Sequence, residues 1–360
     1  MAKNAKISLL WAALLLAVVG VALGRCTHRP AQWRQASGAV WNTTYNITYE
    51  ASRDCSDSIQ AVFRQVEMSL SPFAENSLIS AINRNATDST DALLRRVFAI
   101  SQSVAAASGG KFDPTVSPVV NLWKFGYTGK VDTDSVWEPS AAQIDSALAL
   151  VGIDGCRIDD AGKIHKKAPG TTFNFSAVTK GYACDLMAEM LQRNGARNVL
   201  VEIGGEIASR GVSSRGTPWR VQVDAPLTDS GVPQHEPLTY VELPESGAGV
   251  ATSGNYRNYH GSSHGRVGHT IDPVTGRPVM TDLLSVTVIA SDCATADAWA
   301  TAAMASPTPT AAASLLRGAA ANLRGASRNT TPAAASATAL RAILVIADTL
   351  PPGYRLQRLP

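Results

Sequence analysis

Residues Leu284–Ala305 read LSVTVIASDCATADAWATAAMA, and this stretch predicts a strand that leads directly into a helix. Leu284–Ala290 is rich in β-branched residues, which is typical of a buried strand. The residues from Asp292 onward follow a helical pattern, in which Asp297 and Thr301 are four apart and therefore share one face. Together they could bind one hard cation, although a threonine that bonds back to its own helix is commoner in an isolated D-x-x-x-T.

Short β-like runs and helices alternate along most of the chain, and no internal repeat is present. Alternating or β-branched residues predict strands at Trp41–Glu50, Asn198–Ile203, Trp219–Val223, Leu238–Leu243 and, as the final strand, Ala342–Ala347. Apolar residues at helical spacing predict helices at Ile59–Leu70, at Asp91–Ser108 and from Ser176 to Leu191. Ala302–Ala339 is interpreted as partly helical and partly disordered or inserted. These elements indicate an α+β fold of mostly antiparallel sheets with interspersed helices.

Two polar segments are candidates for functional loops. Gly110–Gly126, GKFDPTVSPVVNLWKFG, is broken by prolines and predicts a loop that contains a short helix. Its residues Trp123 and Phe125, with Trp41, could stack on a planar ring, but aromatic residues near prolines are more often plain packing. Gly249–Val279 holds three of the six histidines and is too glycine-rich to predict regular structure. Long loops of this kind are usually functional.

A third polar segment, Asn174–Leu191, carries Ser176, Thr179 and Lys180 at the start of its helical pattern. A helix N-terminus with hydroxyl groups and a lysine can bind an anion. The alternative is structural: Ser176 would be an N-cap and Lys180 a solvated residue of the first turn. This segment alone favours the structural interpretation.

Other patterns exclude several functions. Gly261–Gly265 matches G-x-S-x-G around Ser263, but a hydrolase nucleophile needs an apolar strand before it, and the preceding residues here are NYRNYH. Walker A, G-x-G-x-x-G and H-E-x-x-H motifs do not occur in the sequence. A formal charge of +3 over 360 residues is too weak to argue for nucleic acid.

Residues 1–30 form a separate segment, because two lysines precede the apolar run Ile7–Leu23. The run predicts an export signal or a membrane anchor. Three possibilities stay open: an uncleaved single-span anchor, lipidation at Cys26, for which Arg25 is an unusual neighbour, and plain secretion. Each of them places residues 31–360 outside the cytoplasm, on the periplasmic or extracytoplasmic side of the membrane.

The other cysteines are Cys55, Cys156, Cys184 and Cys293, an even number with no C-x-x-C spacing. Disulfide pairing cannot be read from this pattern. Cys184 and Cys293 are interpreted as small buried residues in or beside helices. No zinc site is indicated.

Eight motifs follow one another in a fixed order from about Trp41 to about Ala347. They are TTYNITY (Thr43–Tyr49), SPFAENSLISAIN (Ser71–Asn83), GKFDPTVSPVVNLWKFG (Gly110–Gly126), AVTKGYACD (Ala177–Asp185), VEIGGEI (Val201–Ile207), ATSGNYR (Ala251–Arg257), HTIDPVTGRPV (His269–Val279) and ADAWAT (Ala296–Thr301). In this order they resemble the ApbE family of FAD:protein FMN transferases. The resemblance implies an ApbE-like fold over residues 31–360, in one body or two lobes.

The resemblance also implies a reaction: Mg²⁺-dependent transfer of FMN from FAD to a threonine hydroxyl of an exported acceptor, with release of AMP. Acceptors in the family are typically flavoprotein subunits of membrane redox complexes. Asp297 and Thr301 would bind Mg²⁺ through their side chains, and Ala177 through its carbonyl oxygen. Asp297 and His269 would be catalytic, with His269 as the general base, a role suited to an unperturbed pKa of about 6.5.

Further residues fall where the family contacts FAD: Trp41, Phe73, Lys111, Phe112, Asp113, Asn174, Lys180 and Ile271. Asn174 stands where the family usually has Asp, and Trp41-Asn42 replace a frequent Met-Gly, so we expect FAD binding to be tuned and the chemistry retained. Two other functions stay open, a Mg²⁺-dependent FAD pyrophosphatase that releases FMN and a non-catalytic flavin carrier. A serine hydrolase that uses Ser263 is a more distant alternative.

Overall fold

The computed structural model describes residues 30–125, 138–226, 236–254, 259–262, 265–327, 340–350 and 353–360. The signal or anchor expected at residues 1–30 lies almost entirely outside these ranges, as do Cys26 and Ser263. Within them, no helix combines the length and the apolar composition needed to cross a membrane.

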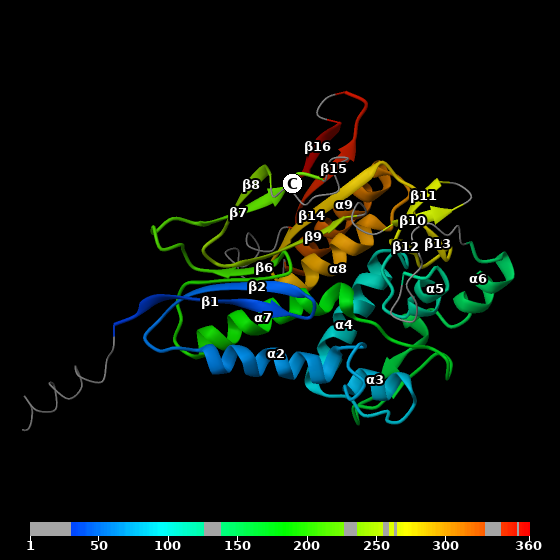
Figure 1. The fold of residues 1–360 in the computed structure, drawn as a ribbon, viewed down its shortest axis with the longest axis horizontal. Coiled ribbons are helices and arrows are strands. Elements are labelled where there is room, and N and C mark those ends of the chain that lie inside the picture. Colours follow the sequence, from blue (N-terminus) through cyan, green and yellow to red (C-terminus); the bar gives the residue numbers. More distant parts are fainter. Residues whose placement is uncertain are drawn as a thin grey trace, which may run out of the picture.

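An eight-stranded sheet forms the centre of the fold (Figure 1). In spatial order its strands are β1 (Gln32–Val40), β2 (Thr43–Ala51), β5 (Val199–Ile203), β6 (Glu206–Arg210), β9 (Ala248–Gly254), β14 (Leu283–Ala290), β15 (Arg341–Ala347) and β16 (Tyr354–Leu359). Every neighbouring pair is antiparallel. The α+β fold with a large antiparallel sheet is therefore confirmed.

Long helices pack on one face of the sheet and on one another (Figure 1). They are α2 (Ser56–Leu70), α4 (Ala92–Ala107), α7 (Ser176–Arg193), α8 (Cys293–Met304) and α9 (Pro309–Ser327). The ends of α4 follow the sequence pattern: Asp91 accepts a hydrogen bond from the backbone N–H of Leu94 at 2.8 Å, and Gly109 and Gly110 have φ of 62° and 81°. The helices and the sheet enclose the largest apolar core.

The opposite face of the sheet carries a two-stranded ribbon of β7 (Trp219–Asp224) and β8 (Pro237–Leu243). Val221 of β7 packs in an apolar cluster with Val250 of β9, whereas the next sheet residue, Ala251, belongs to the helix-side core. This division follows from the alternation of side chains along a strand. The middle of the sheet is consequently buried on both faces, because the ribbon covers the face opposite to the helices.

Shorter elements gather near the ends of α7 and α8. They are α3 (Leu78–Asn83), α5 (Ser117–Leu122), α6 (Ala141–Leu148), the 3-10 turn Ile153–Gly155, β3 (Arg157–Ile158), β4 (Ile164–His165), β10 (Tyr259–Ser262), β11 (Gly265–Gly268), β12 (Ile271–Asp272) and β13 (Arg277–Pro278). Trp123 joins several of them, because its buried ring packs with Ile144 and Ile271 and its Nε1 donates to the carbonyl oxygen of Gly276 at 2.8 Å. Trp123 is thus a packing residue.

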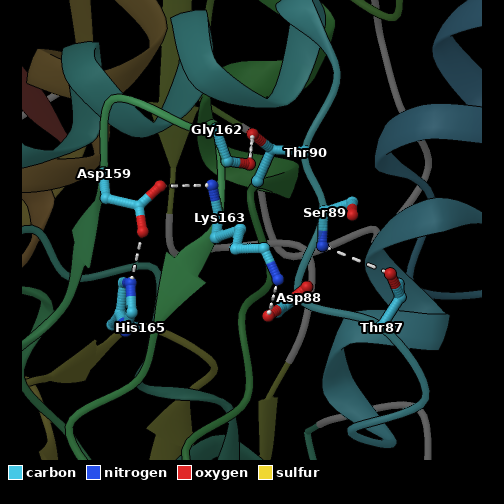
Figure 2. Close-up of polar contacts among 8 residues, drawn as sticks. All are labelled: Thr87, Asp88, Ser89, Thr90, Asp159, Gly162, Lys163 and His165. Atoms are coloured by element: carbon cyan, nitrogen blue, oxygen red, sulfur yellow. Dashed lines mark hydrogen bonds and ion pairs between the residues drawn. The ribbon is translucent and has the colours of Figure 1, made fainter.

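The β3–β4 hairpin carries an exposed polar cluster (Figure 2). Asp159 lies 2.8 Å from Nε2 of His165 and also accepts the backbone N–H of Lys163 at 2.8 Å, while the Lys163 ammonium pairs with Asp88 at 3.0 Å. Ion pairs in solvent contribute little to stability. The Lys163–Asp88 pair connects the hairpin to the chain segment that contains Asp88.

Three predictions about strands are wrong. Gly249–Val279 is not irregular, since it contains β9, an interior strand, and the hairpins β10–β11 and β12–β13. Ala342–Ala347 is not the final strand, because the polar edge strand β16 follows it. Trp41 and Asn42 do not begin a strand either: their φ angles of 48° and 60° form the two-residue turn between β1 and β2.

Candidate active site

A cavity of about 1120 Å³ opens where the N-terminus of α7, one face of α8 and the loop at 111–117 meet the sheet. All but two of the residues predicted for the site line it: Lys111, Phe112, Asp113, Asn174, Ala177, Lys180, His269, Ile271, Asp297 and Thr301. These residues come from segments far apart in the sequence, so the tertiary fold brings them together.

Trp41 and Phe73 are the two predicted residues that are not among the cavity lining. The Trp41 ring packs edge-on against Phe63 with ring centres 5.5 Å apart, and its buried Nε1 has no hydrogen-bond partner among the described residues. Phe73 lies between α2 and α3 and is 69% exposed. Both are therefore outside the cluster that the other residues form.

Asp297 and Thr301 lie on the same face of α8, as the spacing predicts. The Asp297 side chain is buried, and its Oδ2 accepts a hydrogen bond from the backbone N–H of Gly181 at 3.1 Å. One turn later, Thr301 Oγ1 lies 3.3 Å from Oγ of Ser253 on β9. Burial raises the pKa of Asp297, against the opposing effects of the Lys180 ammonium and the Gly181 N–H.

The close approach of α7 to α8 depends on Gly181. A Cβ atom at this position would lie 2.4 Å from the carbonyl oxygen of Cys293, which belongs to the α8 backbone and cannot move independently. This approach is what lets the Gly181 N–H reach Asp297.

Gly181→Ala should therefore destabilise the fold by about 3 kcal/mol and reduce activity at the site, because a methyl group would force the two helices apart. Urea unfolding measures the first effect. Gly318→Ala on α9 is the control: nothing lies within 4 Å of its Cβ position, so stability should stay level or rise slightly. Equal effects from the two substitutions would contradict the packing argument.

Lys180 is ion-paired, although 36% of its side chain is exposed, so the interpretation of it as a merely solvated residue of the first turn is incomplete. Its Nζ lies 2.5 Å from Oε1 of Glu206, the first residue of β6. Burial opposes the ammonium charge, but the carboxylates of Glu206 and Asp297 outweigh it and raise the pKa of Lys180 to about 12. Burial in turn raises the pKa of Glu206 to about 7, although the Lys180 ammonium counteracts it. Sequence reasoning quoted the motif VEIGGEI but did not identify Glu206.

The first turn of α7 is capped differently from the prediction for Ser176. Asn174 Oδ1 accepts the backbone N–H of Ser176 at 3.0 Å, and the Thr179 hydroxyl donates to the carbonyl oxygen of Phe175 at 2.8 Å. Ser176 is the first helical residue and not the N-cap. Asn174 thus orders the helix end that faces the cavity.

Asp185 is a second buried carboxylate that the sequence did not reveal. Its two oxygens accept the backbone N–H groups of Cys293 and Ala294, each at 2.9 Å, at the start of α8. Burial, followed by the nearby Asp292 carboxylate, raises the pKa of Asp185 to about 7. Asp185 holds the two site helices together one turn along α7 from Gly181, whose N–H bonds to Asp297.

The loop at 111–117 is fixed by Asp113. Oδ1 of Asp113 accepts both the N–H and the hydroxyl of Thr115, at 2.8 and 2.6 Å, and Oδ2 accepts the N–H of Ile153 at 3.0 Å. Lys111 adds a second tie, because its Nζ lies 2.7 Å from Oδ2 of the buried Asp272 in β12. These contacts hold the loop next to the segment that carries His269 and Ile271.

Asp113→Ala should destabilise the protein by about 2 to 3 kcal/mol, because three donors lose their acceptor. Weaker FAD binding should accompany the loss of loop order. Thermal unfolding and an FAD titration measure the two effects. Asp145→Ala on the exposed side of α6 is the control, and an Asp113 variant no less stable than this one would refute the assigned role.

His269 follows β11 and is partly buried at the cavity. The ring of Phe125 lies edge-on to it, with ring centres 6.5 Å apart. Phe125 therefore contacts the predicted general base. The sequence had suggested a different contact for this ring, stacking on a planar ligand.

A metal ion at this site would have to use oxygen donors. In the described part of the chain, no group of three or more His, Cys, Asp or Glu side chains could hold a metal. Asp297, Thr301 and Ala177 offer one carboxylate, one hydroxyl and one carbonyl oxygen at the cavity wall. This set suits a hard cation that also keeps water or phosphate ligands.

The remaining motifs add no second reactive centre. Cys55, Cys156, Cys184 and Cys293 are all buried and free, which confirms the interpretation of Cys184 and Cys293. The described residues of the G-x-S-x-G match, Gly261, Ser262 and Gly265, belong to the paired strands β10 and β11, whereas a nucleophile elbow leads from a strand into a helix. Ser263 itself lies outside the described residues.

The comparisons with known proteins agree with the fold. The profile of the ApbE family matches residues 41–323. This chain belongs to the ApbE family. It is 32% identical over 301 residues to the FAD:protein FMN transferase of Vibrio cholerae, covering 81% of this chain and 86% of that protein. It is 33% identical over 281 residues to the FAD:protein FMN transferase of Salmonella typhimurium, covering 76% and 77%.

Solved structures of ApbE proteins share the architecture. The flavin transferase ApbE from Vibrio cholerae superposes with a TM-score of 0.72 at 27% identity, over 92% of this chain and 98% of that one. The apo form of the flavinyl transferase ApbE from Pseudomonas stutzeri gives 0.72 at 29% identity, over 91% and 95%. The structural similarity thus extends over almost the whole length of this chain and of each of the two solved structures.

Proposed function

We propose that this ApbE-family chain is an FAD:protein FMN transferase that attaches FMN to a threonine hydroxyl of an acceptor protein and releases AMP. The observation that carries the proposal is the convergence of Lys180, His269, Asp297 and Thr301 on one cavity. A base, a cation and a buried carboxylate are the groups that phosphoryl transfer to a hydroxyl requires.

Mg²⁺ fits the residues at the bottom of the cavity. Asp297 is buried with a raised pKa, so a nearby cation would stabilise its ionised form. Thr301 and the carbonyl of Ala177 would supply neutral oxygens, in keeping with the preference of Mg²⁺ for a few protein ligands plus water and phosphate. When bound there, Mg²⁺ would neutralise charge on the pyrophosphate and make AMP a better leaving group.

The protein residues would divide the remaining work. His269 would take the proton of the acceptor hydroxyl while its oxygen bonds to the FMN phosphorus and the phosphorus–oxygen bond to AMP breaks. Lys180, held cationic by Glu206, would offset the charge of the phosphates. The loop anchored by Asp113, together with Asn174 and Ile271, would form the FAD-binding wall.

The setting of the reaction follows from the sequence. The apolar run Ile7–Leu23 supports export or anchoring in the membrane, with residues 31–360 on the extracytoplasmic side. The acceptor we propose is an exported flavoprotein subunit of a membrane redox complex. Detection of the full chain in the membrane fraction, with its globular part open to added protease, would test this placement.

The direct test incubates residues 31–360 with FAD, Mg²⁺ and an exported acceptor domain that carries a candidate threonine. We expect flavin fluorescence on the acceptor band of a denaturing gel, lost with EDTA and lost when the threonine is replaced by alanine. Free FMN and AMP without a labelled band would indicate a pyrophosphatase. Intact FAD without a band would oppose both enzymatic functions and favour a flavin carrier.

A further inference from the structure

Glu206 has a carboxylate oxygen that the described protein leaves unused. The residue is 3% exposed and lines the cavity. Oε1 accepts a hydrogen bond from Lys180, but Oε2 is buried and has no hydrogen-bond partner among the described residues. A buried acceptor without a donor is costly, more so when it carries charge.

Three other buried or partly buried carboxylates in this region have hydrogen-bond donors of the chain on both oxygens. Both oxygens of Asp185 and both oxygens of Asp113 accept backbone N–H groups. Glu202, which also lines the cavity, accepts from Gly205 N at 2.8 Å and from Asn46 Nδ2 at 2.7 Å. Glu206 differs from these three, because its Oε2 is the one carboxylate oxygen among the described residues that is buried without a hydrogen-bond partner. The residue lines the cavity.

The chemistry of Oε2 restricts which ligand group can form a hydrogen bond with it. An ionised carboxylate only accepts hydrogen bonds, so Oε2 needs a donor. The phosphate oxygens of FAD are acceptors themselves. Its donors are the hydroxyls of the ribityl chain and the ribose, the adenine amino group and the flavin N3–H, and of these the hydroxyls are carried by the units bonded directly to the phosphates that Lys180 would attract. We propose that Oε2 of Glu206 accepts a hydrogen bond from a sugar or sugar-alcohol hydroxyl of the bound dinucleotide. This assignment rests on the proposed FAD-dependent function and adds a binding residue to it.

The two oxygens of Glu206 would then favour two different parts of the ligand. Oε1 holds the Lys180 ammonium, which attracts phosphate, while Oε2 faces a hydroxyl group. A displaced ligand would place phosphate against Oε2 and repel it. Glu206 would in this way set the register of the dinucleotide along the cavity, in addition to holding Lys180.

Glu206→Gln separates these two roles. The amide oxygen can still accept from Lys180, but an NH₂ group replaces Oε2 and turns an acceptor into a donor. FAD affinity should fall by about 10- to 100-fold, the range of a hydrogen bond to a charged group. Titration calorimetry with EDTA present excludes any effect through a metal. The titration is carried out at about pH 9, where Glu206 is ionised, because its pKa is raised only to about 7.

Glu202→Gln is the matched control, since it removes one negative charge from the same cavity but alters a carboxylate that the chain already satisfies. It should change FAD affinity by less than about threefold. Riboflavin and AMP distinguish the two halves of the dinucleotide: weaker riboflavin binding by Glu206→Gln locates the donor on the flavin half, and weaker AMP binding locates it on the adenosine half, after which the deoxy ligands described below identify the hydroxyl. Either result supports the proposal.

If Glu206→Gln fails to fold, the wild-type protein provides the test. Removing the partner hydroxyl from the ligand, as in 2′-deoxy- and 3′-deoxy-AMP or a deoxyribityl flavin, should cost the same factor in affinity. Unchanged FAD binding by a folded Glu206→Gln variant, or full affinity for every deoxy ligand, would overturn the proposal. Failure of the proposed function is a separate result, because wild-type protein would then neither bind FAD nor label an acceptor.

Discussion

Asp297→Ala should abolish FMN transfer, with a loss of at least about 10³-fold in turnover, equivalent to about 4 kcal/mol of transition-state stabilisation. The substitution removes the charged member of the proposed Mg²⁺ ligand set, leaving a hydroxyl and a carbonyl oxygen. Neutral oxygens alone hold a divalent cation poorly, since charge on the ligands sets much of its affinity. The fluorescent-gel assay across a Mg²⁺ titration measures the loss.

Asp297→Asn is the companion variant, because alanine also deprives the Gly181 N–H of its acceptor. The asparagine oxygen can keep that hydrogen bond, so its unfolding temperature should stay close to wild type while transfer is still lost. Calorimetric Mg²⁺ titration should show weakened binding in both variants. Normal turnover by either one would refute the metal assignment.

The pair of Asp297 and Thr301 was predictable because it depends on local spacing. Residues four apart on a helix share a face whatever the rest of the chain does. The structure puts that face at the cavity. The same reasoning located α4, predicted at Asp91–Ser108 and found at Ala92–Ala107, because its apolar spacing is also a local feature.

Glu206 and Asp185 were not predictable, because their roles depend on contacts between distant segments. Glu206 meets Lys180 across 26 residues, and Asp185 meets the start of α8 across 108. No periodicity in the sequence carries this information. The one hint in the sequence was that Glu206 belongs to the motif VEIGGEI and Asp185 to the motif AVTKGYACD.

The strand β9 was missed for a physical reason that also concerns the site. Its sequence is AGVATSG, with small residues in place of the usual large β-formers. A Cβ atom on Gly249 would lie 2.1 Å from the backbone nitrogen of Cys293. The glycine that weakens the strand signal therefore lets α8 pack against the sheet, which brings Asp297 and Thr301 to the cavity.

His269→Ala should lower the rate of transfer by about 10²- to 10⁴-fold, the usual contribution of a general base. FAD affinity should change little, because the imidazole would act on the acceptor hydroxyl and not on the dinucleotide. Single-turnover labelling of the acceptor at saturating FAD separates these two quantities. A parallel loss of FAD affinity and rate would instead make His269 a binding residue.

The pH dependence gives the sharper criterion. A base must be unprotonated, so wild-type transfer should fall as the pH drops and the His269 imidazole takes up a proton. That limb should become shallower in His269→Ala, and the dependence that is left should come from the buried carboxylates, such as Glu206 with its pKa raised to about 7. His165→Ala is the matched control, since His165 is an exposed histidine paired with Asp159 in the β3–β4 hairpin (Figure 2). His165→Ala should keep both the wild-type rate and the wild-type fall in rate at acid pH. A change seen in His269→Ala alone is then due to the histidine at the cavity.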